Sequence, residues 1–326
     1  MVKIPLDWCI KLALGLAFIF FQHLSLAADT QQHPKLFIVT SVSPITNMVR
    51  NIAGTHIQVQ GIVPDGADSH TFEPIPSDAK ILQRADLIIV NGLDLELPTI
   101  KLAEKVKKDR TPIVQLGNLT LKEEEWQYDF SFPREQGHPN PHLWLNIELV
   151  MRYVKIIEQK LIALDPAHQS SFAMNAAAYL TKLQKLDQAI LNCVTTIPEN
   201  NRKLVTYHDS FAYFAPRYGM TVIAAVQPSD FSEPSPQEVI TIIRQIKDAG
   251  VPAIFGSEVF PSKVMQQIAR EANVRFIDQL SDDELPAPPN HSFIGMMVNN
   301  ISIMTEALGG NPACMANNID ASNITF

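Results

Sequence analysis

Residues 167–196 read AHQSSFAMNAAAYLTKLQKLDQAILNCVTT and lie at the middle of the 326-residue chain. Apolar side chains recur in this segment at intervals of three or four residues, at Phe172, Ala176, Leu180, Leu183, Leu186 and Ile190. That spacing places them on one face of a helix. A helix of about 30 residues would be roughly 45 Å long, which is unusual in a globular protein. We therefore expect one long helix, assigned to residues 166–197, to join the parts of the chain before and after it.

The chain on both sides of this segment alternates between strand-like and helix-like patterns. Short apolar, β-branched runs predict strands at 36–40, 57–63, 87–90, 112–116, 203–207, 221–226, 253–255 and 274–277. Helical spacing between them predicts helices at 44–52, 77–85, 97–106, 146–164, 211–218, 236–249, 261–272 and 292–308. Such alternation is typical of parallel sheets covered by helices. The predicted fold is α/β with two lobes, each a mainly parallel sheet covered by helices: an N-terminal lobe (35–165) and a C-terminal lobe (198–326).

The N-terminus has the pattern of a secretory signal peptide. Lys3 and Lys11 flank a short polar start, an apolar run covers 12–21, and small residues follow up to Ala28. The run is short for a membrane span, so we expect cleavage near Ala27 or Ala28 and assign residues 1–28 to the signal. Cys9 precedes the apolar run, which is the wrong place for a lipid anchor. These features predict a soluble protein in the periplasm.

Charge and cysteine content narrow the classes of function. The net charge is −8 and no basic stretch is present, which argues against binding of nucleic acid. Cys193 and Cys314 remain after signal cleavage. Two cysteines in an oxidising compartment can pair, but the sequence does not show that they are close, so both states stay open. They are too few and too far apart for a cysteine zinc cluster.

Four possible metal ligands fall near the ends of predicted strands or after the polar loop 117–141. These are His70, His142, His208 and Asp278, two from each half of the chain. Ligands of open α/β sheets bind beyond the carboxyl ends of the strands, so a site between the lobes could unite all four. Three imidazoles and a carboxylate suit zinc and could suit manganese or iron. Each residue also has a simpler interpretation: a polar loop residue for a histidine, or a helix cap or turn for Asp278.

Several sequence blocks resemble the metal-binding proteins of ABC importers, the ZnuA/TroA-like group. DSHTFEP at 68–74, followed by PSD at 76–78, is similar to the D-P-H-x-F-E-P-x-P-x-D signature of that family. ADL at 85–87, NGL at 91–93 with Glu96, NPHLWL at 140–145 and YHDSF at 207–211 resemble further blocks. FID at 276–278 matches the position of the last ligand. The resemblance runs from about Leu36 to Leu308.

This resemblance implies two α/β lobes bridged by a rigid helix and a metal held by His70, His142, His208 and Asp278. We also expect a monomer that is not an enzyme, because four protein ligands would leave no position for a reactive water. Such a protein passes its metal to the membrane permease of an ABC importer, which works with a cytoplasmic ATPase. The rigid helix predicts small lobe movements, and affinity should fall as acidification protonates the imidazoles.

Departures from the family pattern bear on the choice of metal. Ser69 and Asn140 replace a proline and an aspartate. Zinc-uptake members often carry a histidine-rich loop before the second ligand, whereas residues 117–141 offer only His138. Manganese-type members usually have glutamate where this chain has His208. A third imidazole softens the site, so we expect Zn²⁺, with Mn²⁺ or Fe²⁺ as alternatives.

Other roles and classes remain open at this level. His138 could capture metal transiently or be a solvated loop residue, and Glu258 could bond a ligand imidazole or simply line the cleft. A zinc hydrolase would use Asp278 as a general base at a three-histidine site. On a third interpretation, the protein has the same fold but binds an organic metal chelate or adheres to a host surface.

Overall fold

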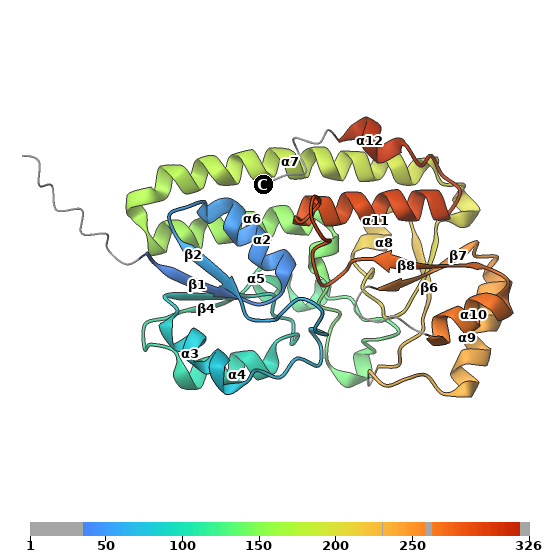
Figure 1. The fold of residues 1–326 in the computed structure, drawn as a ribbon, viewed down its shortest axis with the longest axis horizontal. Helices are drawn as coiled ribbons and strands as arrows, with labels where there is room; N and C mark the ends of the chain where they lie inside the picture. Colours follow the sequence, from blue (N-terminus) through green and yellow to red (C-terminus); the bar gives the residue numbers. More distant parts are fainter. Residues whose placement is uncertain (1–34, 230, 258–262, 320–326) are drawn as a thin grey trace, which may run out of the picture. The chain divides into compact units, whose positions relative to one another are not determined.

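The computed structural model describes residues 35–229, 231–257 and 263–319, and from Leu36 onward the chain forms one compact unit. It contains two four-stranded parallel sheets (Figure 1). The first sheet, in the order β2-β1-β3-β4, consists of β1 (Phe37–Thr40), β2 (Gln58–Gly61), β3 (Leu87–Val90) and β4 (Ile113–Gln115). The second, in the order β6-β5-β7-β8, consists of β5 (Lys203–Thr206), β6 (Thr221–Ala225), β7 (Ala253–Ser257) and β8 (Arg275–Leu280). The predicted α/β class with two parallel sheets is confirmed.

Helices connect the strands and cover the sheets (Figure 1). The α-helices beside the first sheet are α2 (Ser43–Ala53), α3 (Pro76–Arg84), α4 (Leu97–Val106), α5 (Leu116–Thr120) and α6 (Ile147–Leu164). Those that follow β5 are α8 (Phe214–Tyr218), α9 (Pro236–Ala249), α10 (Lys263–Ala272), α11 (Phe293–Ala307) and α12 (Cys314–Asn318). Short 3₁₀ turns are η1 (Glu123–Glu125), η2 (Arg134–Gln136), η3 (Leu143–Leu145), η4 (Pro166–His168) and η5 (Glu199–Asn201).

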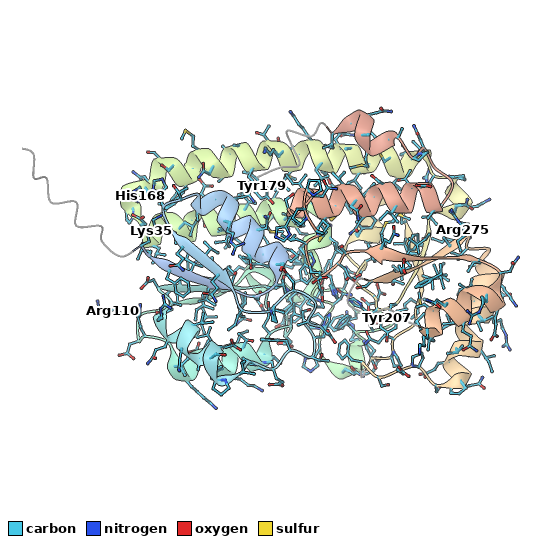
Figure 2. The ribbon with its side chains drawn as sticks, in the orientation of Figure 1. Lys35, Arg110, His168, Tyr179, Tyr207 and Arg275 are labelled. Atoms are coloured by element: carbon cyan, nitrogen blue, oxygen red, sulfur yellow. A yellow bond between two sulfur atoms is a disulfide. The ribbon has the colours of Figure 1, made fainter. Side chains whose placement is uncertain are left out.

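The long helix α7 (Gln169–Thr196) joins the two sheets, as predicted. It begins three residues later than the expected boundary because Pro166–His168 forms the separate turn η4. Its apolar face is buried, and one continuous hydrophobic core includes Leu183 of the helix together with Ile38 of β1 and Phe255 of β7. Figure 2 labels His168 just before the helix and Tyr179 on it. Because both sheets share this core with α7, movement of one against the other would disturb buried packing.

A disulfide fastens the C-terminal segment to α7. Cys193 on α7 and Cys314 on α12 are bonded, with their Cα atoms 5.5 Å apart. Residues 314–318 form the short helix α12. Its residues Cys314 and Met315 are buried. The pairing that the sequence left open is present.

Two further expectations differ from the structure in ways that matter for the site. The helix predicted at 211–218 begins only at Phe214, and the strand predicted at 274–277 extends to Leu280. Among the described residues, no helix combines the length and apolar character that a membrane crossing requires. The predicted signal peptide (1–28) and Glu258 lie outside the described residues.

Candidate metal centre

Three histidine side chains converge on one point between the two sheets. The Nε2 atom of His142 lies 3.2 Å from Nε2 of His70 and 3.2 Å from Nε2 of His208. His142 and His208 are fully buried, whereas His70 is half-buried. His70 belongs to the loop after β2, His142 lies just before η3, and His208 follows β5 closely. Figure 2 labels Tyr207, the residue between β5 and His208. The predicted convergence of the three imidazoles is therefore seen in the structure.

The carboxylate in this group is Asp283, and the structure does not bring Asp278 there. One ligand atom each from His70, His142, His208 and Asp283 lie within 4.8 Å of one another. Asp278 instead lies inside β8 with an exposed side chain. The strand predicted from the sequence ended too early, at Ile277. In the structure β8 continues past a shift of register in its pairing with β7, and Leu280 lies opposite Ser257. The loop beyond the strand therefore begins at Ser281.

Asp283 and its neighbour Asp282 are both buried and anchored by hydrogen bonds. Ser69 Oγ donates to Asp283 Oδ2 at 2.6 Å, and Ser257 Oγ donates to Asp282 Oδ1 at 2.9 Å. Trp144 Nε1 donates to the Asp282 carbonyl at 2.6 Å. Burial, reinforced by the neighbouring Asp282, raises the pKa of Asp283 well above its usual range. Sequence reasoning missed this pair, although two adjacent carboxylates after a strand were a visible signal.

Local hydrogen bonds orient His70. Asp68 accepts from the His70 backbone N–H at 2.9 Å and from the Thr71 hydroxyl at 2.9 Å. An aspartate that bonds the backbone two residues later forms an Asx turn, which fixes the direction of the chain. Asp68 therefore helps to direct the imidazole of His70 toward the group.

Asn140 orients His142 and selects its tautomer. Its Oδ1 accepts from the backbone N–H of His142 at 2.9 Å and lies 2.8 Å from the ring Nδ1. Its amide nitrogen donates to Asp129 Oδ2 at 2.7 Å and to the Asp209 carbonyl at 2.5 Å. Because the oxygen is the atom facing Nδ1, Nδ1 carries the proton and Nε2 presents a lone pair to the other two imidazoles.

A second buried network holds the Pro141–His142 turn from the side of β3. Asn91 donates its amide to the Pro141 carbonyl at 2.9 Å, and its Oδ1 accepts from the Tyr153 hydroxyl at 2.7 Å. The Glu96 carboxylate in turn accepts from the backbone N–H groups of Asn91 and Gly92, each at 2.9 Å. The end of β3 is thereby tied to the loop that carries His142.

The electrostatics of the site favour neutral imidazoles. Burial lowers the pKa of His70 well below its usual value, and the nearby His208 lowers it further. The pKa of His142 is lowered by burial first and then by His208 and His70. Metal ions bind the unprotonated nitrogen, so these side chains are in the binding form at neutral pH.

Two more carboxyl groups lie beside the centre, Asp209 buried and Asp129 half-buried. Burial raises the pKa of Asp129 to about 6, against hydrogen bonds from Asn140 and the backbone that lower it. Burial and the nearby Asp129 raise the pKa of Asp209 to about 8. Neither residue belongs to the four-residue group, and both border it through Asn140.

A cavity of about 150 Å³ opens on the His70 side of the centre. Its lining includes His70, Asp94, Phe132, His138 and Phe231. His138 Nδ1 lies 2.9 Å from Asp94 Oδ2, and both side chains are largely exposed. The structure therefore places His138 at the entrance and outside the group of four, and a role in transient metal capture stays a prediction.

Comparisons with known proteins agree with this architecture. The profile of the family described as zinc-uptake complex component A, periplasmic, matches residues 38–307, and the chain belongs to this family. The manganese ABC transporter substrate-binding lipoprotein PsaA of Streptococcus pneumoniae is 29% identical over 84% of this chain and 89% of its own length. The iron-binding protein YfeA of Yersinia pestis is 30% identical over 87% and 92%. The periplasmic zinc-binding protein TroA of Treponema pallidum is 28% identical and superposes with a TM-score of 0.76 over 84% of this chain and 99% of that one.

Family membership bears on two expectations from the sequence. The resemblance to the ZnuA/TroA-like group is confirmed. The named relatives are metal-binding proteins or, for PsaA, a substrate-binding lipoprotein of an ABC transporter, and the chain belongs to the same family, which confirms the expectation that it is not an enzyme. The hydrolase interpretation, which required Asp278 at the centre, is set aside.

Proposed function

We propose that this protein captures one Zn²⁺ ion in the periplasm with His70, His142, His208 and Asp283, and delivers it to the permease of an ABC importer driven by a cytoplasmic ATPase. One observation carries the proposal: three Nε2 atoms from distant parts of the chain converge, with those of His70 and His208 each 3.2 Å from that of His142. His142 Nε2 has no proton to give, because Nδ1 bears it. A cation at the shared point would satisfy all three lone pairs together.

The spacing of the nitrogens supports a four-coordinate ion. Zinc–nitrogen bonds of about 2.0–2.1 Å at tetrahedral angles would separate two ligand nitrogens by about 3.3 Å. The separations of 3.2 Å from His142 to His70 and to His208 agree with that value. Four protein ligands would fill the shell and leave no position for a reactive water, as binding without chemistry requires.

Manganese and iron are the alternatives that the named relatives raise. Both prefer more oxygen ligands than zinc does, and Asp282 Oδ2, 3.4 Å from His208 Nε2, is the oxygen that could supply one. We expect protein purified without added metal to contain one equivalent of zinc by elemental analysis. His208→Glu should move the preference toward manganese. A wild-type protein that carries neither zinc nor manganese would refute the proposal.

The fourth ligand is tested by a matched pair of aspartate variants. Asp283→Asn removes the buried carboxylate, and Asp278→Asn makes the same change on the exposed face of β8. We expect the zinc dissociation constant, measured by chelator competition, to rise at least about 100-fold for Asp283→Asn and to stay unchanged for Asp278→Asn. The reverse pattern would restore Asp278 as the ligand.

Export and delivery complete the proposal. The signal-like segment 1–28, the Cys193–Cys314 disulfide and the family support a periplasmic location. Fractionation of expressing cells, with mass spectrometry of the mature N-terminus, should find a soluble protein beginning just after Ala27 or Ala28. Light scattering should find a monomer. Recovery of the precursor in the cytoplasm would contradict the export step.

A further inference from the structure

Of the four residues in the group, His70 is the one that the described part of the chain leaves partly exposed. The other three members of the group are almost fully covered, with exposed fractions of 0% for His142, 1% for His208 and 5% for Asp283. Of the four, only His70 lines the cavity that opens beside the centre. A metal that enters or leaves along this cavity must therefore pass the imidazole of His70.

Two aromatic rings cover His70 at this point. The ring of Phe231 stacks on the imidazole with centroids 5.0 Å apart and an interplanar angle of 19°. The ring of Phe132 lies 5.4 Å from the same imidazole and meets Phe231 edge-on at 6.0 Å. Phe132 comes from the loop before η2, whereas Phe231 comes from the segment between β6 and α9. The stack therefore joins segments far apart in the sequence.

The backbone of Phe231 is held in an unfavourable conformation. Its φ is +60°, in the left-handed region that bulky side chains rarely adopt. Its N–H donates to the Pro228 carbonyl at 3.0 Å, and Gln227 Nε2 donates to its carbonyl at 3.3 Å. A non-glycine residue stays in this region only where surrounding contacts fix it, and such residues concentrate at ligand clamps. The conformation turns the ring onto His70.

We propose that the ring of Phe231 narrows the entrance to the metal site on its His70 side and thereby sets the rate at which metal enters and leaves. This inference rests on the proposed metal-binding function. Phe231 carries no ligand atom, so its ring contributes little to the difference in free energy between the bound and free metal. The ring stacks on His70 and forms part of the wall of the cavity beside it, so it narrows the path of the metal in both directions.

The test measures zinc association and dissociation rates by stopped flow, with a fluorescent chelator as the reporter. Phe231→Ala removes the ring, whereas Phe231→Gly removes the ring and also relieves the positive φ. Phe231→Leu keeps apolar volume without aromatic stacking. Phe130→Ala is the matched control, because Phe130 belongs to the same loop as Phe132 but is 52% exposed. Thermal unfolding and zinc stoichiometry establish that each variant is folded and competent.

We expect Phe231→Ala and Phe231→Gly to raise both rate constants about tenfold, the size expected from losing one or two ring contacts, with an affinity within about twofold of wild type. The rate constants of Phe231→Leu should lie between those of wild type and Phe231→Ala, and those of Phe130→Ala should match wild type. Association and dissociation rate constants of Phe231→Ala within twofold of wild type would overturn this inference but leave the proposed zinc binding intact. A rise in dissociation only, with an equal loss of affinity, would overturn it too. A wild-type protein that binds no zinc would overturn the proposed function as well.

Discussion

The disulfide between α7 and α12 should supply a large share of the stability of the protein. The two cysteines are separated by 121 residues, so the bond closes a long loop in the unfolded chain. The chain-entropy relation for a loop of this size gives about 4.9 kcal/mol at 25 °C. That is comparable with the whole unfolding free energy of a typical domain, about 5–15 kcal/mol. Replacing Cys193 and Cys314 together by alanine should lower the unfolding free energy by several kcal/mol.

The measurement is urea unfolding of the metal-free protein, followed by circular dichroism. Dithiothreitol should lower the urea midpoint of wild type toward that of the double variant. It should leave the midpoint of the double variant unchanged. Both proteins should retain native circular dichroism without urea, because α7 is held in the shared core by many other contacts. A loss of stability below about 1 kcal/mol would refute the loop-closure reasoning.

Three further predictions concern the surroundings of the centre. Asn140→Ala removes the partner that orients His142 and should weaken zinc binding about 10–100-fold by chelator competition, with an unchanged fold by circular dichroism. Asp209, whose pKa is raised to about 8, holds a proton in the folded state that the unfolded chain releases near pH 4, so stability should fall as pH rises toward 8. Between pH 7 and pH 8 the unfolding free energy of the metal-free protein, measured with urea, should therefore fall by up to about 1.4 kcal/mol in wild type and much less in Asp209→Asn. An equal fall in the two proteins would contradict this. Trp144→Phe leaves the buried Asp282 carbonyl without its indole donor and should cost about 1–3 kcal/mol in urea unfolding, and no loss would show that this bond is dispensable.

Features that depend on local periodicity were predictable from the sequence. The runs FIVT and LIIV at β1 and β3 are apolar throughout because both faces of these strands are covered, and they were recognised as strands. The apolar face of α7 was visible as side chains spaced three or four residues apart. His208 follows a strand so closely that its place at the sheet edge could be deduced.

Features that depend on the pairing of distant segments were decided only by the tertiary structure. The end of β8 is set by its partner β7, so the carboxylate that reaches the three imidazoles is Asp283 rather than Asp278. The disulfide and the stacking of Phe231 on His70 likewise join residues more than 100 positions apart. The sequence by itself determined where the helices and strands lie along the chain, their α/β order and the three histidines proposed as metal ligands. The elements could be located because short-range spacing encodes which face of each element is buried. Which side chains meet was left to the packing of the elements, because proximity between remote residues is a property of the folded chain alone.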